Sequence, residues 1–201
     1  FEINMKNIAV VFGGYSSEHG VSVKSGEFIY ENLKDNPDWN IYEICISKKE
    51  KTVKFDERIF DLDFQNFTFE IDGITIKPDA VFNIIHGDPG ENGVLAEVLE
   101  KNHIPQTGCN NYVSQLTFNK KKFIEFVDSL DIPCAKQILL KKKETINITE
   151  ILETIQIPCI VKPNNGGSSI GVSKVNYIDE LEDKIKIAFN EDNQVLIETF
   201  L

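Results

Sequence analysis

The sequence lacks any apolar segment long enough for a membrane-spanning helix. No apolar run in its 201 residues approaches the roughly 18–20 residues that cross a bilayer, so we expect no membrane partner. No charged stretch followed by an apolar one opens the chain, and secretion is not indicated. Phe1 to Asn4 precede Met5, which opens a strand-like run, and are interpreted as an expression remnant.

Metal-type cysteine pairs and an excess of positive charge are also missing. The four cysteines are widely separated, at Cys45, Cys109, Cys134 and Cys159. They form no CxxC pair, and we interpret them as buried free thiols of a cytoplasmic protein. The net charge of −11 argues against nucleic acid as the main partner, because a phosphate backbone would be repelled. A small anionic ligand in a locally basic pocket stays compatible with that charge.

The composition, with 41% hydrophobic and 26% charged residues, indicates a globular protein of one large or two small domains. Strand-like and helix-like segments alternate in the first half, at residues 6–12, 22–33, 43–47, 79–85 and 94–102. Short strands and turns fill residues 52–77. The alternation predicts an α/β fold with a parallel sheet, in which the apolar run 79–85 is a strand buried on both faces.

The pattern changes after residue 108, where we place a domain boundary. Helices are predicted over residues 113–130 and 178–189. Strands are predicted over residues 137–140, 159–162, 170–175 and 195–198. The sequence therefore predicts an N-terminal domain, residues 5–108, and a second domain, residues 109–201.

Two glycine-rich turns follow strands of the predicted parallel sheet. The first, Gly13 to Ser22, offers close backbone approach and the free amides of a helix N-terminus. It is not GxGxxG, so a dinucleotide site is disfavoured. The second, His86 to Gly93, also follows a strand, and the carboxyl ends of parallel strands share one crevice. Glu18 and His19 favour a ligand site there, although a plain βα turn explains each turn taken alone.

Lys120 lies on an apolar stripe of the helix predicted over residues 113–130. At a period of 3.6 residues, one face carries Leu116, Lys120, Phe123, Val127 and Leu130. A lysine in such a stripe must find an anion or extend its ammonium to water, because a lone buried ammonium is costly. Phosphate is the functional partner that we consider, and an extended surface lysine is the alternative.

Lys162 ends the strand predicted over residues 159–162, and a glycine–serine hairpin follows it, Pro163 to Gly171. Successive backbone amides and hydroxyls form an anion-binding concavity, and a glycine loop can close over phosphates. The segment is not a Walker A loop, which needs GxxxxGK[ST] before a helix. A plain hairpin would need neither this lysine nor Ser168 and Ser169, so we favour a phosphate site.

Taken in order, these segments resemble the D-alanine–D-alanine ligase family of ATP-grasp enzymes. The resemblance covers Met5 to Leu201, and its most specific parts are the two glycine-rich turns and the run Lys162 to Gly171. It implies a Rossmann-like parallel-sheet domain followed by the smaller α+β lobe of an ATP-grasp fold, with the large C-terminal lobe absent. The implied reaction joins two D-alanines through a D-alanyl phosphate at the expense of ATP, for peptidoglycan synthesis. The 201-residue chain by itself is expected to be inactive.

The resemblance also implies which residues meet the first D-alanine. Glu18 would bind its ammonium, and His86 would lie beside it. Ser168 would link to Glu18, and these two are the expected catalytic residues. A homodimer through the N-terminal domain is compatible with the family.

For ATP, the resemblance implies two lysines and the loop above them as phosphate ligands, at Lys120, Lys162, Gly167, Ser168 and Ser169. The adenine would lie against Glu198, Phe200 and Leu201, with Glu198 accepting a hydrogen bond from its amino group. Mg²⁺ is expected with the ATP, with metal ligands beyond residue 201.

Five positions depart from the pattern usual in the family: Gly20, Asn92, Ala96, Asn119 and Thr199. We expect tuning of affinity there rather than loss of function. Three other hypotheses remain. They are a D-alanine–D-lactate type ligase, a non-catalytic module that binds nucleotide or D-alanine, and a dinucleotide-dependent enzyme, which the missing GxGxxG disfavours.

Overall fold

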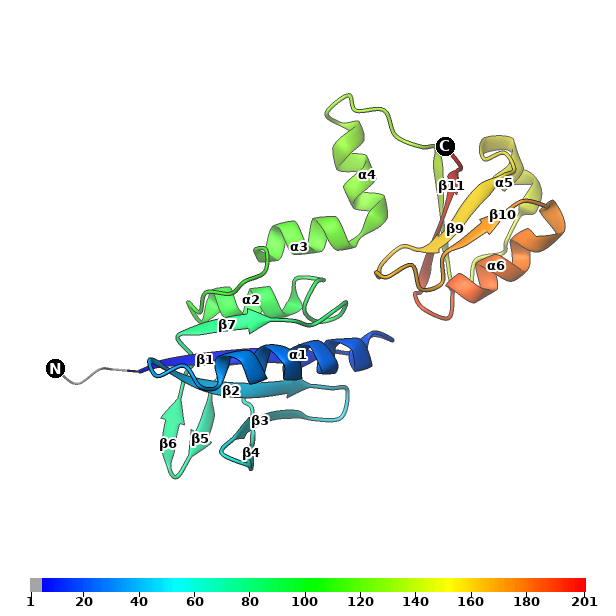
Figure 1. The fold of residues 1–201 in the computed structure, drawn as a ribbon. Coiled ribbons are helices and arrows are strands. Elements are labelled where there is room, and N and C mark those ends of the chain that lie inside the picture. Colours follow the sequence, from blue (N-terminus) through cyan, green and yellow to red (C-terminus); the bar gives the residue numbers. More distant parts are fainter. Residues whose placement is uncertain (1–4) are drawn as a thin grey trace. The chain divides into compact units, whose positions relative to one another are not determined.

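The computed structural model describes residues 5–201, so the predicted remnant, residues 1–4, lies outside the described residues. Two compact units make up the chain, the first ending at Gln115 and the second running from Leu116 to Leu201 (Figure 1). The domain boundary predicted after residue 108 falls a few residues before this division.

A five-stranded sheet organises the first unit, in the order β4-β3-β2-β1-β7. Its strands are β1 (Lys6–Gly13), β2 (Trp39–Ile46), β3 (Lys51–Phe55), β4 (Arg58–Asp61) and β7 (Ala80–Asn83). Strand β1 runs parallel to both β2 and β7, whereas β3 and β4 are antiparallel additions at one edge. The predicted α/β class with a parallel-containing sheet is confirmed.

Elements cover both faces of this sheet. They are α1 (His19–Leu33) on one face and, on the other, α2 (Val94–Lys101) with the small hairpin of β5 (Phe69–Ile71) and β6 (Ile74–Ile76). Because side chains alternate along a strand, Ala9 and Val11 of β1 pack on the α2 side while Val10 and Phe12 pack on the α1 side. Gly26 of α1 lies directly on the Phe12 ring, so the helix approaches the sheet closely.

The predicted strand over residues 79–85 is wrong in length and burial. Strand β7 spans only Ala80–Asn83, and of its four residues only Val81 is buried. It pairs with β1 on one side. On its other side it makes a bridge, from Val81 to Gln106, and a hydrogen bond, from the Asn83 amide to Thr107 Oγ1 at 3.0 Å. An edge strand of this kind does not need apolar residues on both faces, and the remaining apolar residues lead into the following turn.

A four-stranded antiparallel sheet organises the second unit, in the order β10-β9-β11-β8. Its strands are β8 (Gln137–Lys141), β9 (Cys159–Pro163), β10 (Ser173–Val175) and β11 (Gln194–Thr199). Its apolar face packs with α5 (Ile148–Thr154), the 3₁₀ turn η1 (Ile178–Glu180) and α6 (Leu181–Ala188). Helix α5 was not predicted, and β10 and α6 are shorter than the ranges predicted for them. Val161 and Ile197 face this core, so Lys162 and Glu198 project from the opposite face.

The single helix predicted over residues 113–130 is wrong. The chain forms α3 (Asn111–Phe118) and α4 (Lys120–Asp128), separated at Asn119, whose backbone is extended with φ −88° and ψ 100°. The Asn119 side chain accepts a hydrogen bond from the Lys122 amide at 3.0 Å and so begins a new helix.

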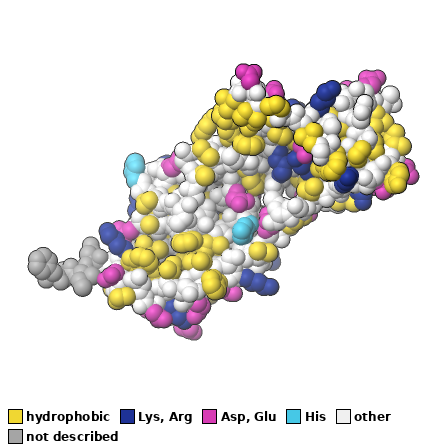
Figure 2. Space-filling view, turned by 45° about the horizontal axis from the view of Figure 1, so that its top comes forward, with side chains coloured by type: hydrophobic (Ala, Val, Ile, Leu, Met, Phe, Trp, Pro, Cys, Tyr) yellow, Lys and Arg dark blue, Asp and Glu magenta, His cyan; other side chains and the backbone are white. Residues whose placement is uncertain are grey.

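The predicted apolar stripe is therefore interrupted, and it is not buried. Phe123 and Leu130 are 41% and 56% exposed, and Figure 2 shows hydrophobic side chains gathered over α4. The cysteine prediction needs a similar correction. All four are free thiols, but Cys109 is exposed and only Cys159 is fully buried. Among the described residues, no helix is long and apolar enough to cross a membrane.

Candidate functional site

In the first unit, Glu18 lies in the turn that joins β1 to α1. Gly13 and Gly14 have φ of +97° and +99°, a conformation that favours glycine, and they turn the chain away from the strand end. The Gly13 amide donates to Ser22 Oγ at 2.9 Å, and that hydroxyl donates to the Ile84 carbonyl at 2.7 Å. These bonds tie the turn to the neighbouring strand end, and Glu18 is held there only 6% exposed.

The second glycine-rich turn meets the first, as predicted. Ser16 Oγ donates to the His86 carbonyl at 2.8 Å, and the Tyr15 amide donates to the Asp88 carbonyl at 2.7 Å. A Cβ placed on Gly87 would lie 3.8 Å from Glu18 Oε2, so the backbone at residue 87 lies directly beside this carboxylate. The site therefore combines a buried acid with a close-packed glycine turn.

Other residues of the second turn hold its shape. The Glu91 carboxylate accepts from the Gly87 amide at 2.7 Å and so closes the turn on itself. Asn92, where the family usually has an acid, accepts from the Val94 amide at 3.2 Å. His86 is half-buried. Glu91 and Asn92 thus order the backbone beside Glu18.

In the second unit, Lys162 and Glu198 form an ion pair. Lys162 Nζ lies 2.6 Å from Glu198 Oε1, and the two side chains are only 18% and 17% exposed. The antiparallel register places Lys162 opposite Leu196, one pleat away from Glu198 on the same face of the sheet. The family resemblance implies that both residues bind ATP, but their pairing with each other was not predicted.

Lys120 is the second cation of this unit, and it opens α4. Its Nζ donates to the Gly166 carbonyl at 2.6 Å. Burial lowers the pKa of Lys120, and the nearby Lys162 cation lowers it further, while Asp192 and Glu198 act in the opposite direction. Lysine and carbonyl thus meet at the base of the glycine–serine loop.

That loop begins after β9 and presents exposed polar groups. Gly167, Ser168 and Ser169 are exposed, and both serines have positive φ, 47° and 59°. Two successive residues in this conformation bend the chain so that neighbouring amides turn to one side, as in anion-binding concavities. The structure thus places the loop beside the two lysines, and the predicted link between Ser168 and Glu18 stays a prediction.

The residues expected beside the adenine follow Glu198. Phe200 is partly exposed, and the centroid of its ring lies 3.6 Å from Lys174 Nζ. Leu201 is exposed. The role of these residues toward a base stays a prediction.

Several residues that order this site were missed. Asn164 lies within the predicted hairpin but was assigned no role, and no role was predicted for Asp192. The Asp192 carboxylate accepts from both the backbone and side-chain amides of Asn165, at 2.7 and 2.8 Å. These partners lie 27 residues apart, so no local pattern in the sequence could have paired them.

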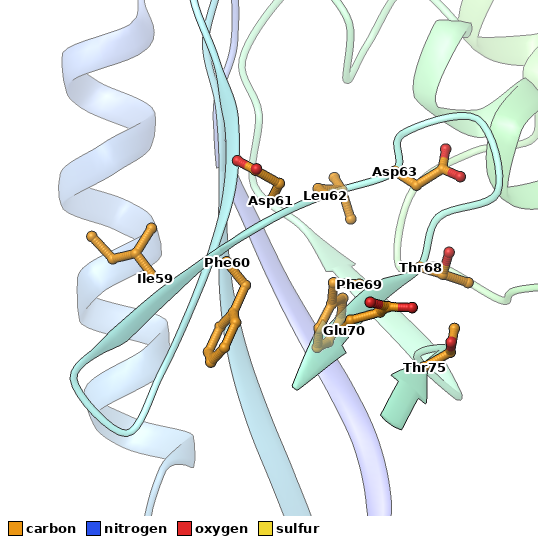
Figure 3. Close-up of a pocket in the computed structure, with 9 residues that line it drawn as sticks. All are labelled: Ile59, Phe60, Asp61, Leu62, Asp63, Thr68, Phe69, Glu70 and Thr75. Carbon is orange, nitrogen blue, oxygen red and sulfur yellow. The ribbon is translucent and has the colours of Figure 1, made fainter. Parts of the chain in front are cut away.

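A hollow in the first unit lies away from the predicted residues. It is lined by Ile59, Phe60, Asp61, Leu62, Asp63, Thr68, Phe69, Glu70 and Thr75, from β4 to β6 (Figure 3). It contains acidic and apolar side chains and no lysine or arginine, so it does not suit a nucleotide phosphate.

Comparison with known protein families matches both parts of the chain. The model described as D-ala D-ala ligase N-terminus matches residues 7–109, and the model described as D-ala D-ala ligase C-terminus matches residues 126–201.

Curated relatives extend this result. A D-alanine–D-alanine ligase of Flavobacterium psychrophilum is 43% identical over 195 residues, covering 97% of this chain and 59% of that protein. One of Christiangramia forsetii is 43% identical over 197 residues, covering 98% of this chain and 60% of that protein. The chain thus spans less than two thirds of the length of these relatives.

Solved structures agree. D-alanyl-alanine synthetase A from Vibrio cholerae has a TM-score of 0.82 and 29% identity, covering 98% of this chain and 60% of that one. The VanG D-Ala:D-Ser ligase from Enterococcus faecalis has a TM-score of 0.81 and 28% identity, covering 98% of this chain and 63% of that one. With both family models matched in order along these two units, the chain belongs to the D-alanine–D-alanine ligase family.

Proposed function

We propose that this chain provides the first-substrate site and part of the ATP site of a D-alanine–D-alanine ligase, an ATP-dependent carboxylate–amine ligase of peptidoglycan synthesis. ATP phosphorylates the carboxylate of one D-alanine, and the amine of a second D-alanine attacks the acyl phosphate with loss of phosphate. The observation that carries the proposal is the gathering of Lys120, Lys162 and Glu198 at the base of a glycine–serine loop in a member of this family.

Glu18 is proposed to bind the ammonium of the first D-alanine. A carboxylate that is 6% exposed interacts strongly with a cation, because little water competes for it. His86, which precedes the close-packed Gly87 backbone, would lie beside the same substrate. Ser168 is proposed to connect the phosphate loop to Glu18 and so to align the substrate carboxylate with ATP.

Lys120 and Lys162 are proposed to bind the ATP phosphates. Both ammonium groups are partly buried, and they repel each other, since Lys162 lowers the pKa of Lys120. A polyanion between them would remove that repulsion and neutralise the negative charge that moves during phosphoryl transfer. The amides and hydroxyls of Gly167, Ser168 and Ser169 would close over the same phosphates.

Glu198 is proposed to change partners when ATP binds. Lys162 would turn from the carboxylate to a phosphate, which frees Glu198 Oε1 to accept from the adenine amino group. Phe200 and Leu201 are proposed to flank the base.

Mg²⁺ bound with ATP would neutralise phosphate charge and polarise the phosphoryl oxygens. In residues 5–201, no three His, Cys, Asp or Glu side chains gather to hold a metal ion, so we assign no Mg²⁺ ligand to them. Four free cysteines suit the reducing cytoplasm, which we propose as the compartment. A homodimer through the first unit is proposed as well, where α1 exposes Val21 and Phe28.

A ligase with a different second substrate is the alternative function. The similarity to a solved D-Ala:D-Ser ligase favours testing it, since the name of that protein gives D-serine as the second substrate. D-Serine and D-lactate therefore belong beside D-alanine in any assay of the second substrate.

The test begins with ATP binding to this chain, measured by titration calorimetry. Lys162→Ala should weaken ATP binding by about 10- to 100-fold, the loss expected for one hydrogen bond to a charged group. Lys186→Ala is the matched control, because it removes the same charge from α6, on the other face of the sheet. Equal affinity of the Lys162 variant and the unmodified chain would overturn the phosphate assignment.

Turnover is the second part of this test. The 201-residue chain should release no ADP from ATP, Mg²⁺ and D-alanine, whereas a polypeptide extended to the relatives' length should do so. In the extended polypeptide, Glu18→Gln should raise the KM for D-alanine. D-alanine-dependent ADP release by the 201-residue chain would show that the proposal of an inactive chain is wrong.

A further inference from the structure

Asn164 is a fully buried amide at the end of β9, two residues after Lys162. Its exposed fraction is 0%, which would be costly for an amide without hydrogen-bond partners. Both ends of the side chain and both backbone groups are paired. These bonds connect Asn164 to two other elements, α4 and β11.

On one side, Asn164 holds the first turn of α4. Its backbone carbonyl accepts from the Lys120 amide at 3.0 Å, and its Oδ1 accepts from the Lys121 amide at 2.9 Å. The first amides of a helix have no partner within the helix. The local cap, Asn119, accepts only from the Lys122 amide. Asn164 supplies the acceptors for the two preceding amides, although it lies 43 residues from Lys121 in the sequence.

On the other side, Asn164 is fixed to β11. Its backbone amide donates to the Gln194 carbonyl and its Nδ2 donates to Gln194 Oε1, both at 2.9 Å. The side chain therefore bridges β11 and the first turn of α4, with its oxygen and its nitrogen each held by a hydrogen bond.

Helix α4 has few other anchors of this kind. None of the residues Lys120–Asp128, all of which the structure describes, is buried. A helix without a buried side chain gains little from apolar packing, so its position depends more strongly on bonds at its ends. The Asn164 bonds act at the end that carries Lys120.

We infer that Asn164 is a positioning residue that fixes Lys120 against Lys162, and so sets the spacing of the two ammonium groups toward the phosphates. This inference rests on the proposed function for its last step, the phosphates. Its first step, the placing of Lys120, stands on the bonds alone.

The titration of Lys120 reports this placement without any ligand. The charged groups that act on Lys120 are Lys162 of β9, Glu198 of β11 and Asp192 of the preceding turn, and burial of Lys120 adds to the effect of Lys162. If α4 moves away, the Lys120 ammonium becomes more exposed and lies farther from Lys162. Its lowered pKa should then rise toward the ordinary lysine value.

The experiment is competitive acetylation of the chain across pH, with the reactivity of Lys120 followed by mass spectrometry. In the unmodified chain, Lys120 should titrate below an exposed lysine such as Lys186. In Asn164→Ala, its titration should move upward, and ATP affinity should fall by about tenfold. Gln194→Met, which removes one acceptor and leaves Asn164 in place, should move the titration in the same direction but less.

Asn147→Ala is the matched control, because Asn147 caps α5 in the same unit through its bond to the Glu150 amide. It should cost similar stability and leave the Lys120 titration unchanged. An unmoved titration in both folded variants, Asn164→Ala and Gln194→Met, would overturn the inference, as would an equal shift in Asn147→Ala. A shift without any ATP binding would instead overturn the proposed function and leave the positioning role intact.

Discussion

At the scale of single residues, the candidate ATP site is built from groups that satisfy one another. Lys162 pairs with Glu198, and Lys120 donates to a backbone carbonyl. A buried ion pair is sensitive to the loss of one partner, since the other is left as an unpaired buried charge. Gln137 of β8 is the exception on this face of the sheet. It lies opposite Glu198, and its buried Oε1 has no hydrogen-bond partner among residues 5–201.

Replacing Gln137 should therefore stabilise the second unit. Gln137→Leu removes the unpaired oxygen at similar volume, and the free energy of unfolding should rise by about 1 kcal/mol. Urea unfolding measures this change, and hydrogen exchange of the β8 and β11 amides places it in the second unit. Gln194→Leu makes the same substitution where Oε1 accepts from Asn164, and it should lower the stability instead. If both variants are equally destabilised, the unpaired oxygen is not costly.

At the scale of elements, the break at Asn119 decides how α4, the helix that begins at Lys120, is placed. A continuous helix would have carried Lys120 on the same stripe as Leu116. Asn119, the extended residue between α3 and α4, instead makes Lys120 the first residue of a new helix. That helix begins next to the glycine–serine loop, which Asn119 meets in a bridge to Asn165. The residues on both sides of Asn119 form helices, as their types suggest. The Asn119 side chain, however, accepts a hydrogen bond from a backbone amide that a continuous helix would use internally.

The cap gives a direct test of this arrangement. Asn119→Ala removes the acceptor for the Lys122 amide and should destabilise α4 by about 1 kcal/mol. Asn119→Asp should retain or improve its stability, because a carboxylate also accepts and is favoured at a helix N-terminus. Hydrogen-exchange protection of the α4 amides distinguishes the two variants. Equal protection in both would show that Asn164 alone holds this helix end.

At the scale of the whole molecule, the chain contains two units with separate cores. The clusters around β1 belong to the first unit, and the cluster of β9, β11 and α6 belongs to the second. The residues expected to bind D-alanine lie in the first unit, and those expected to bind ATP lie in the second. The expected link from Ser168 to Glu18 would join them.

Separate cores predict separate responses to mutation. Ile185→Ala in the second core should cost about 2–5 kcal/mol, the range for a large buried aliphatic side chain. Hydrogen-exchange protection should fall in residues 116–201 and persist in residues 5–115. Leu99→Ala in the first core is the reciprocal variant and should give the reverse pattern. Loss of protection throughout the chain in either variant would show that the two units unfold together.

Local signals in the sequence predict most strands and both glycine turns. The apolar run of β1 and the glycines that follow it suffice to place Glu18, because a strand end and a helix start flank them closely. The length of β7 and the break at Asn119 could not be predicted in this way. They depend on which neighbour pairs with the strand and on an acceptor supplied by a distant loop.

The sequence by itself determined the α/β class, the choice of Lys120 and Lys162 as candidate phosphate ligands, and the resemblance to the family. Each of these rests on residue types at short spacing. Only the tertiary structure decided that Lys162 pairs with Glu198 and that Asn164 joins β11 to α4. Both depend on the register of antiparallel strands and on contacts between residues 30 to 43 positions apart. Such contacts form only when the chain folds, and no local pattern encodes them.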